Sequence, residues 1–322
     1  MSENKEKILI IDFGSQFTQL IARRVREFGV YSEIVPFNNI NKEDAIENLS
    51  GIIFSGGPHS VIHDGSPQAP NWLFEIGKPI LGICYGQQTI VNQLGGKVIN
   101  SGKREYGNSS LLITQQSPLF KGVWEKDQNY TVWMSHGDSV SQLPEEFDVI
   151  AKTDNAPFAA ISCDEKKYYG LQFHPEVFHT VNGNLIIKNF LDICSISFNW
   201  TMASFFEVQR KIITEQVKND RVICGLSGGV DSSVVAVLLH KILGDQLTCI
   251  YIDNGLMRKN ESEQVVGMFR EHFNIPLVHV DASKLFLSKL KGVVDPERKR
   301  KTIGNVFIDV FDEEAAKIDR KS

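Results

Sequence analysis

The chain contains few cysteines, and they are scattered rather than grouped. Its 322 residues include five cysteines, none spaced as Cys-x-x-Cys, so neither a zinc site nor a redox dithiol is indicated. An odd, scattered set is typical of proteins in a reducing cytosol. Apart from one motif described below, we expect the cysteines to be small buried hydrophobic residues. These are Cys163, Cys194, Cys224 and Cys249.

Long hydrophobic runs and an excess of positive charge are also missing. No apolar run approaches the roughly 20 residues that span a bilayer, and residues 1–7 lead into a strand without a signal-peptide core. The formal net charge is −5, which argues against a nucleic acid as the main ligand. We therefore expect a cytoplasmic protein that binds neither a membrane nor a nucleic acid.

The length and the hydrophobic periodicity favour two α/β domains. A chain of 322 residues is expected to form two domains, and strands that alternate with helices predict parallel sheets covered on both faces. The first series has strands at 7–13, 30–35, 51–54, 79–84, 130–133, 159–162 and 169–173, with helices at 16–28, 86–94 and 184–194. The second has strands at 221–226, 248–253 and 277–281, with helices at 231–243 and 261–272.

These two series predict domains at residues 1–196 and 197–322, each a mostly parallel sheet flanked by helices. Only three strands of the second sheet are visible, so we expect the second domain to be incomplete. Residues 304–318 carry an apolar face at helical spacing that needs a partner. That face consists of Phe307, Val310, Phe311 and Ile318.

A loop of sequence Ser-Gly-Gly-Val-Asp-Ser-Ser connects the strand at 221–226 to a helix that begins at about Asp231. Backbone N–H groups at a helix start bind anions, glycines let phosphate oxygens approach the backbone, and the serines add hydroxyl donors. The loop lacks the Gly-Lys-Ser/Thr ending of a Walker A loop. An ordinary glycine-rich turn is the alternative, but the order of the residues favours a nucleotide site. Its members are Ser227, Gly228, Gly229, Val230, Asp231, Ser232 and Ser233.

A second candidate site centres on Cys84. The string Gly82-Ile83-Cys84-Tyr85-Gly86 lies between a strand and a helix and has the form of a nucleophile elbow with cysteine in place of serine. The turn exposes the sulfur, and the helix N-terminus favours a thiolate. Because a thiol is only a few per cent ionised at neutral pH, this cysteine needs a base. A buried, unreactive cysteine is the alternative.

The candidate base is His174, which ends the strand at 169–173 in the string Gln-Phe-His-Pro-Glu. Glu176 lies two residues further on and can orient the imidazole toward Cys84. His136 and His179 are competing bases, although the Ser-His-Gly-Asp string around His136 looks more like a substrate-contact loop. We expect two other histidines to be solvated loop residues, His59 and His63.

An acyl-enzyme route also needs donors for an oxyanion. The glycine-rich string at 54–58 follows a strand, so the N–H of Gly57 can pair with that of Tyr85. Each such donor lowers the barrier by roughly 3 kcal/mol. A simple loop is the alternative for this string.

The residues around Cys84 resemble the class I (triad) glutamine amidotransferases. The resemblance implies hydrolysis of glutamine through a cysteine thioester, with the ammonia delivered to a second site. It implies that Cys84 is the nucleophile, His174 the base and Glu176 its orienting partner. It further implies that Gly57 and Tyr85 bind the oxyanion, and that Gln88 and Asp138 hold the glutamine.

The loop at 227–233 resembles the pyrophosphate loop of N-type ATP pyrophosphatases, which cleave ATP between the α and β phosphates. The two motifs together, with the strings at 12–16, 23–27, 103–107, 253–261 and 295–304, resemble the glutamine-hydrolysing GMP synthase family. This resemblance implies that ATP adenylates xanthosine 5′-monophosphate and that ammonia then displaces AMP to give GMP. It implies Mg²⁺ bound with ATP and no tightly bound organic cofactor. Asp231 and Asp253 are candidates either for binding the Mg²⁺ or for ordering the loop.

The resemblance also implies features outside the two motifs. The basic run Arg298, Lys299, Arg300 and Lys301 fits a mobile lid that closes over phosphates, and a solvated charged loop is its alternative. Full-length relatives of this family form homodimers through a further domain that helps to bind the xanthine nucleotide, and that domain is absent from these 322 residues. A truncated copy that retains only glutaminase activity is therefore the second hypothesis. A non-catalytic module is the third, and the intact motifs argue against it.

Overall fold

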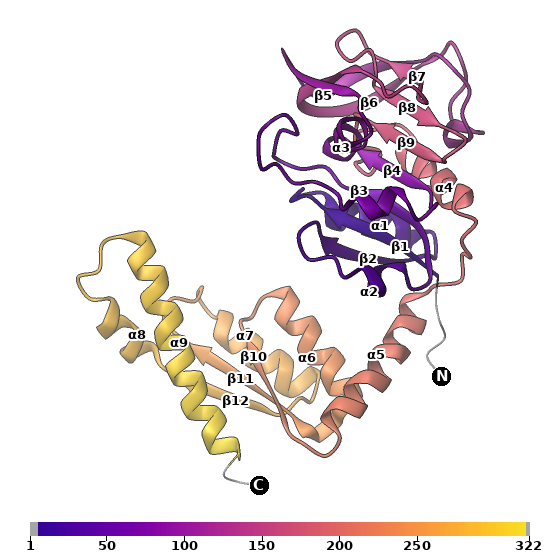
Figure 1. Cartoon of the computed structure of the whole chain (residues 1–322). Coiled ribbons are helices and arrows are strands. Elements are labelled where there is room, and N and C mark those ends of the chain that lie inside the picture. The colour runs from indigo at the N-terminus through magenta and orange to yellow at the C-terminus, as the bar shows by residue number, and fades with distance from the viewer. Residues whose placement is uncertain (1–5, 320–322) are drawn as a thin grey trace. The chain divides into compact units, whose positions relative to one another are not determined.

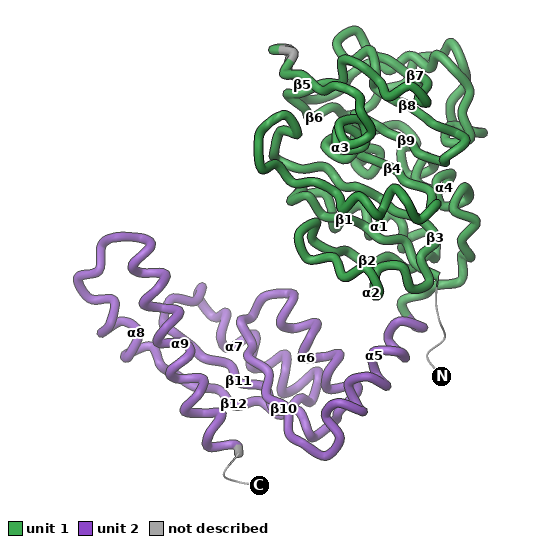
Figure 2. Tube along the Cα trace, in the orientation of Figure 1, with its two compact units in different colours: residues 1–202 green, residues 203–322 purple. Residues whose placement is uncertain are grey.

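The computed structural model describes residues 6–319, without the side chains of residues 101, 103 and 319. It confirms the α/β class. The chain divides into two compact units, residues 1–202 and 203–322 (Figure 2), whereas the sequence placed a boundary between residues 196 and 197. Each unit is described by itself below, and no helix within the described range is both long and apolar enough to cross a membrane.

The first unit is built on a sheet in which nine strands are described, in the order β2-β1-β3-β4-β9-β8-β7-β5-β6 (Figure 1). The strands are β1 Lys7–Asp12, β2 Tyr31–Pro36, β3 Leu49–Phe54, β4 Ile80–Ile83, β5 Lys97–Ile113, β6 Asn129–Gln142, β7 Asp148–Lys152, β8 Ala160–Cys163 and β9 Tyr168–Leu171. The helices are α1 Thr18–Glu27, α2 Lys42–Ile46, α3 Tyr85–Gln93 and α4 Gly183–Ile193, with short 3₁₀ turns at Asn71–Phe74 and Pro118–Phe120.

This sheet is parallel at one end and antiparallel at the other. Strands β2, β1, β3, β4 and β9 pair in parallel, as the alternating pattern predicted. Strands β8, β7, β5 and β6 continue the sheet by antiparallel pairing, which the sequence did not predict. The parallel half of the sheet is buried on both faces. Ile8 and Ile10 of β1 pack on the side of α1 and α4, and Leu9 and Ile11 pack on the opposite side.

The antiparallel half contains a long hairpin of β5 and β6. The sequence predicted only a strand at 130–133 in this region. The reason is composition: residues 101–110 of β5 are mostly polar or glycine and lack the alternation that identifies a half-buried strand. Pairing with β6 along most of its length holds β5 in an extended conformation.

The second unit is built on three described parallel strands in the order β10-β11-β12. The strands are β10 Val222–Leu226, β11 Leu247–Asp253 and β12 Leu277–Asp281. The helices are α5 Met202–Val217, α6 Val230–Leu243, α7 Glu261–Gly267 with a π-helical continuation at Met268–His272, α8 Ser283–Leu290 and α9 Pro296–Asp319, with a 3₁₀ turn at Gly244–Gln246. Alternate residues of β11 face opposite sides: Cys249 and Tyr251 pack toward α6 and α7, and Ile250 and Ile252 toward α8 and α9.

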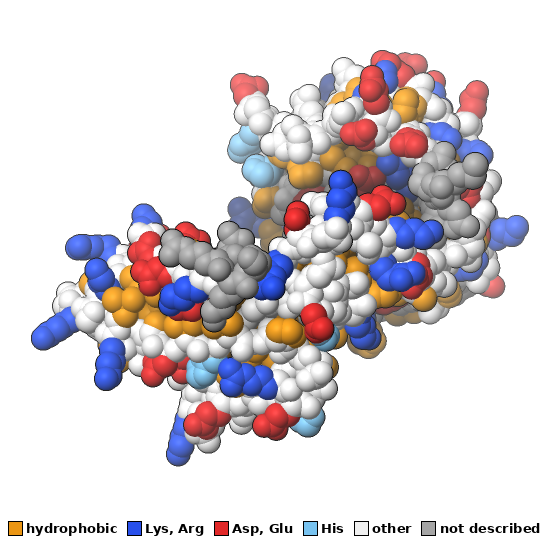
Figure 3. Space-filling view, turned by 90° about the horizontal axis from the view of Figure 1, so that it is seen from below, with side chains coloured by type: hydrophobic (Ala, Val, Ile, Leu, Met, Phe, Trp, Pro, Cys, Tyr) orange, Lys and Arg blue, Asp and Glu red, His pale blue; other side chains and the backbone are white. Residues whose placement is uncertain are grey.

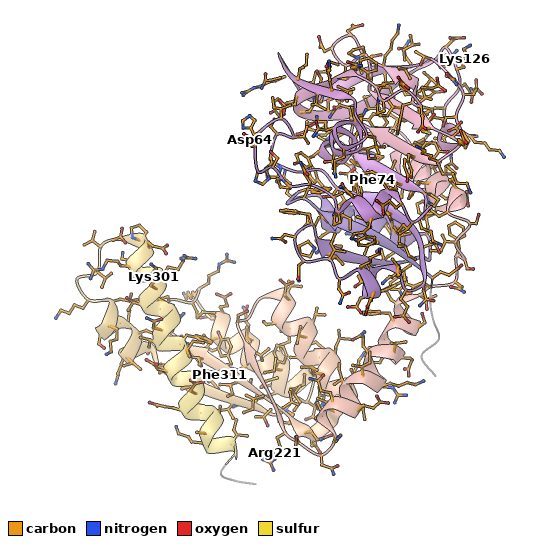
Figure 4. All side chains as sticks on the ribbon, in the orientation of Figure 1. Asp64, Phe74, Lys126, Arg221, Lys301 and Phe311 are labelled. Carbon is orange, nitrogen blue, oxygen red and sulfur yellow. The ribbon has the colours of Figure 1, made fainter. Side chains whose placement is uncertain are left out.

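The apolar face at 304–318 lies on helix α9, and β11 and α8 supply the partner that it required. Val306 and Val310 are buried against Ile250 of β11 and Phe286 of α8. Figure 4 labels Phe311 on this helix, which packs on the same cluster.

The basic run at 298–301 lies near the start of the same helix (Lys301 in Figure 4) and not in the loop that the sequence suggested. Asp295 accepts a hydrogen bond from the N–H of Arg298 at 2.8 Å, and Pro296 opens the helix, which is a favourable first position for proline. Arg300 pairs with Glu297 at 2.8 Å. Figure 3 shows lysine and arginine side chains interspersed with aspartate and glutamate on the face it views. A role of the run as a lid remains a prediction.

Candidate active site

Cys84 lies in the strained turn between β4 and α3 that a nucleophile elbow requires. Its backbone has φ +54° and ψ −105°, a conformation that costs a non-glycine residue of order 1–3 kcal/mol. The flanking glycines are sterically required. A Cβ on Gly82 would lie 2.5 Å from the carbonyl carbon of Gly86, and one on Gly86 would lie 2.3 Å from the carbonyl oxygen of Phe54.

Strand β9 carries the base toward this elbow. It pairs in parallel with β4, and the N–H of Cys84 donates to the carbonyl of Leu171 at 2.6 Å. The Cys84 side chain is buried, with its Sγ 3.5 Å from the carbonyl oxygen of Ser135 and 3.6 Å from Nε2 of Gln172. The residues that directly follow β9, His174 among them, therefore lie close to the sulfur.

His174 and Glu176 form a buried pair beside Cys84. Nδ1 of His174 lies 2.7 Å from Oε1 of Glu176, and both side chains are almost fully buried. Burial alone lowers the pKa of His174, but the charge of Glu176 and hydrogen bonds with Cys84 and Glu176 outweigh it and hold the pKa well above its ordinary value. The edge-on ring of Phe17 packs against the imidazole, with 5.3 Å between ring centroids.

Two hollows of about 360 Å³ each open on Cys84. The first is lined on its far side by polar residues of the β5–β6 hairpin, including Arg104 and Asp138. The second is lined by His174 and by the loop at 14–17 that follows β1. Cys84, Gly57 and Ser135 line both. The sulfur is thus reached from two directions, with the histidine on one side and the hairpin on the other.

The two proposed oxyanion donors adjoin the sulfur. Gly57 follows β3, and a Cβ there would lie 2.8 Å from the carbonyl oxygen of Phe13 and 3.3 Å from Cγ of Tyr85. Tyr85 is the first residue of α3, so its N–H has no acceptor within the helix. Both residues line the first hollow.

Gln88 and Asp138 also line the first hollow, and they are joined to each other. Nε2 of Gln88 donates to the backbone carbonyl of Asp138 at 2.9 Å and to Oε1 of Gln172 at 3.2 Å. Both residues are buried. Gln172 in turn donates to Cys84, so one chain of hydrogen bonds connects the 135–138 segment to the sulfur.

The competing histidines are engaged elsewhere. Nδ1 of His136 lies 3.0 Å from the carbonyl oxygen of Asp138, and Nε2 lies 3.1 Å from Oε2 of Glu105. Both ring nitrogens of His136 therefore already have partners within the protein. His179 is exposed and its ring packs on Trp133, with 4.4 Å between centroids. His59 is exposed, as expected, but it also lines the first hollow.

Sequence reasoning missed Arg104 and Glu105 as site residues. Glu105 and His136 are register partners on β5 and β6, so Glu105 contacts a histidine that lines the hollow. Arg104, its neighbour, lines the hollow itself although it lies far from Cys84 in sequence. The string at 103–107 was noted only as part of a resemblance. A charged run followed by Tyr-Gly, facing a Ser-His-Gly-Asp string, is the signal that could have identified a hairpin here.

The loop at 227–233 has the form of an open anion cradle. Gly228 has φ +80°, and α6 begins at Val230 with an extended Gly229 before it. Oγ of Ser227 lies 3.0 Å from Oγ of Ser232, and the hydroxyl of Ser233 donates to the carbonyl of Gly229 at 2.8 Å. Most of the loop is exposed, including Ser227, Gly229, Val230 and Asp231.

The acidic residues near this loop do not form a complete metal site. Asp231 is exposed in the first turn of α6, and a carboxylate oxygen of Asp253 accepts from the N–H of Gly255 at 2.8 Å. Among residues 6–319, no three histidine, cysteine, aspartate or glutamate side chains gather as a set of metal ligands. These residues fit a Mg²⁺ ion that is held mainly by phosphate oxygens, the usual arrangement for Mg²⁺ with ATP.

Comparisons with known proteins agree with the two motifs. Residues 9–194 match the family Glutamine amidotransferase class-I, and residues 205–306 match the family NAD synthase. Glutamine-hydrolyzing GMP synthases from Agrobacterium fabrum and Zymomonas mobilis are 58% and 56% identical to the chain over 316 and 317 residues. Each alignment covers 97% of the chain and 60% of the relative, so the chain spans about three fifths of the length of these relatives.

A solved structure resembles the first unit. It is the crystal structure of a protein from Thermoplasma acidophilum that is described as a candidate GMP synthase subunit, and it superposes with a TM-score of 0.53 at 31% identity. The match covers 64% of the chain and 98% of that protein.

Proposed function

Because the chain belongs to the class I glutamine amidotransferase family, we propose that its first unit hydrolyses glutamine at Cys84. The observation that carries this proposal is the convergence of three groups: a cysteine in a strained elbow, a histidine that lines the same hollow, and a buried carboxylate 2.7 Å from Nδ1 of that histidine. This arrangement of nucleophile, base and orienting acid supports acyl transfer.

The elevated pKa of His174 suits both halves of such a reaction. The sulfur of Cys84 attacks the amide carbon of glutamine, and the N–H groups of Gly57 and Tyr85 bind the oxygen that becomes negative. The protonated imidazole gives its proton to the leaving nitrogen, so ammonia departs and a thioester remains. The imidazole then takes a proton from water, whose oxygen attacks the thioester to release glutamate and restore the thiol.

We place the amino-acid end of glutamine in the first hollow. Arg104 lines this hollow and can face the α-carboxylate, while the carboxylate of Asp138 can face the α-ammonium group. Gln88 holds Asp138 in place through its backbone carbonyl. In this assignment Arg104 is a specificity residue, because it distinguishes glutamine from amides that lack a carboxylate.

We propose that the second unit binds Mg·ATP at the loop 227–233, for the adenylation of xanthosine 5′-monophosphate in GMP synthesis. The exposed cradle of N–H and hydroxyl groups supports a phosphate ligand, and the names of the relatives support this substrate. Asp231 and Asp253 would be the protein's carboxylates nearest the ion. We place the reaction in the cytoplasm, where the five free thiols suit a reducing environment.

A glutaminase without synthetase activity is the second candidate, since the chain spans only part of the length of its relatives. Two assays separate the candidates. Ammonia release from glutamine should fall at least about 10³-fold in Cys84→Ala and stay at the wild-type level in Asp231→Ala. Formation of AMP and pyrophosphate from ATP and xanthosine 5′-monophosphate should be lost in Asp231→Ala, and its absence from the unmodified chain would leave only the glutaminase.

A further inference from the structure

Two of the five cysteines face each other across neighbouring strands of the second unit. Cys224 of β10 and Cys249 of β11 are register partners in a parallel ladder. Partner residues on adjacent strands point to the same face of a sheet, and both side chains pack in the cluster that contains Leu226 and Tyr251. The sequence suggested two unrelated buried cysteines. The sheet makes them a pair.

The separation of the strands suits a covalent bond between these thiols. Adjacent strands lie about 4.8 Å apart, and disulfides join α-carbons about 4.4–6.8 Å apart. The interaction between the two thiols also lowers the pKa of Cys224 and raises that of Cys249. Cys224 is partly exposed and Cys249 is fully buried. The Cys224 sulfur is therefore accessible to a reactant as a thiolate, and the Cys249 sulfur lies beside it as a thiol.

We propose that Cys224 and Cys249 form a reversible oxidation site that reacts with peroxides. The Cys224 thiolate attacks one peroxide oxygen, the O–O bond breaks, and the other oxygen leaves as water after protonation, which gives a sulfenic acid. The Cys249 sulfur then attacks the Cys224 sulfur, the S–O bond breaks, and a second water leaves. Two thiols are oxidised to a disulfide and one hydrogen peroxide is reduced to two waters.

The product should be easily reduced by cellular thiols. Cys224 is partly exposed, so a cellular thiolate can attack the bond at this sulfur and begin its reduction by exchange. Only Gly225 and Leu226 separate Cys224 from Ser227, so the bond would fix the strand that leads into the phosphate loop. This oxidation site does not depend on the proposed function of either unit.

The first unit offers a matched control. Cys194 is buried, and burial raises the pKa of its thiol. Its sulfur packs against the backbone of Gly51, where a Cβ would lie 2.3 Å away. This thiol should react far more slowly with peroxide than Cys224.

Tryptic mapping of the full chain tests the proposal without any variant. Trypsin cuts after Arg221, Lys241 and Arg258, so residues 222–241 carry Cys224 and residues 242–258 carry Cys249 on separate peptides. After brief treatment with hydrogen peroxide, blocking of free thiols and digestion without reductant, we expect the two peptides linked by a disulfide. Treatment with dithiothreitol before blocking should return both as free thiols.

Variants then assign the steps. Cys249→Ala should abolish the linked pair and leave a sulfenic acid on Cys224 that dimedone traps, whereas Cys194→Ala should leave the linked pair unchanged. Recovery of the two peptides from the unmodified chain as unlinked thiols, or linked to any other cysteine, overturns the proposal, and that result does not depend on whether a variant folds.

Discussion

The sites of the two units differ in how far their polar groups are buried and already hydrogen-bonded to one another. Around Cys84 the reactive groups are buried and bonded to one another: His174 to Glu176, Gln88 to Asp138, and Gln172 to the sulfur. In the loop at 227–233 the hydroxyls bond mainly to neighbours within the loop, and most of the loop is exposed.

This difference indicates two ways of preparing a site. Buried polar groups must find partners within the protein, so the Cys84 site is preorganised and its function should depend on each partner. An exposed phosphate cradle keeps its donors available for a ligand. Substitutions in the first unit should therefore act strongly on catalysis and stability, and those in the second mainly on the binding of ATP.

The largest effect is expected from loss of the base. His174→Gln should lower ammonia release by about 10³-fold or more, because the sulfur loses its proton partner. Ser232→Ala, in the phosphate loop, should leave ammonia release unchanged and weaken the binding of ATP. Steady-state assays of ammonia and calorimetric titration with Mg·ATP measure the two effects. Equal glutaminase activity in His174→Gln and the unmodified chain would remove the contrast between the units.

A glycine pair tests the same contrast in stability. Gly86→Ala should destabilise the first unit by about 3 kcal/mol, because its Cβ would meet the backbone of Phe54 at 2.3 Å. Gly304→Ala, within α9, has no atom within 4 Å of the new Cβ and should stabilise the second unit by about 0.5–1 kcal/mol.

Urea unfolding separates these two effects. The four tryptophans all lie in residues 1–202, so their fluorescence reports the first unit, while hydrogen exchange of α9 reports the second. A shift of the same sign in both variants would contradict the steric account.

Loss of Arg104, the proposed partner of the glutamine α-carboxylate, should have a smaller effect. Arg104→Gln should raise KM for glutamine about 10–100-fold and change kcat little, as expected when a charge-assisted contact is lost from substrate binding. Lys97→Gln, an exposed cation on the same strand, is the matched control. Hydrolysis of 4-aminobutanamide, which lacks the α-carboxylate, should be the same in Arg104→Gln and the unmodified chain. A parallel loss with both substrates would show that Arg104 acts on the structure of the site and not on the carboxylate.

The smallest expected effect is on the pH dependence of stability. His174 has a raised pKa in the folded protein, so it binds a proton more tightly there than in the unfolded chain. Its contribution is fully present below the ordinary histidine pKa and is lost as the pH rises through the folded value. The first unit should thus lose stability with rising pH over this window, and His174→Gln should show less of that loss. Urea midpoints by tryptophan fluorescence across the window provide the measurement; identical pH profiles would exclude the linkage.

Local motifs were predictable from the sequence because local sterics determine them. The elbow needs Gly82 and Gly86 beside Cys84, and the phosphate loop needs a glycine with positive φ before a helix. Each motif can therefore be recognised from a string of at most seven residues. The strand that ends near His174 was predicted by its apolar run. The sequence predicted the helix at 296–319 only from residue 304 onward and missed its beginning, although the Asp-Pro-Glu string at 295–297 is a favourable helix start.

Contacts that depend on strand register were not predictable. Glu105 meets His136 only because β5 and β6 pair in one register. Cys224 meets Cys249 only because the first residues of β10 and β11 are register partners, so the third residues of the two strands also lie opposite each other. A sequence shows that strands exist more readily than which residues they bring together.

The most direct test of the account is to trap the nucleophile. A glutamine analogue with a chloromethyl ketone in place of its side-chain amide should alkylate one residue of the chain, Cys84, and excess glutamine should prevent the reaction. Mass spectrometry of the digested protein would find the adduct on the peptide that contains residue 84 and not on those that contain the other four cysteines. An adduct on another residue, or undiminished ammonia release from a chain in which Cys84 is fully alkylated, would contradict the account.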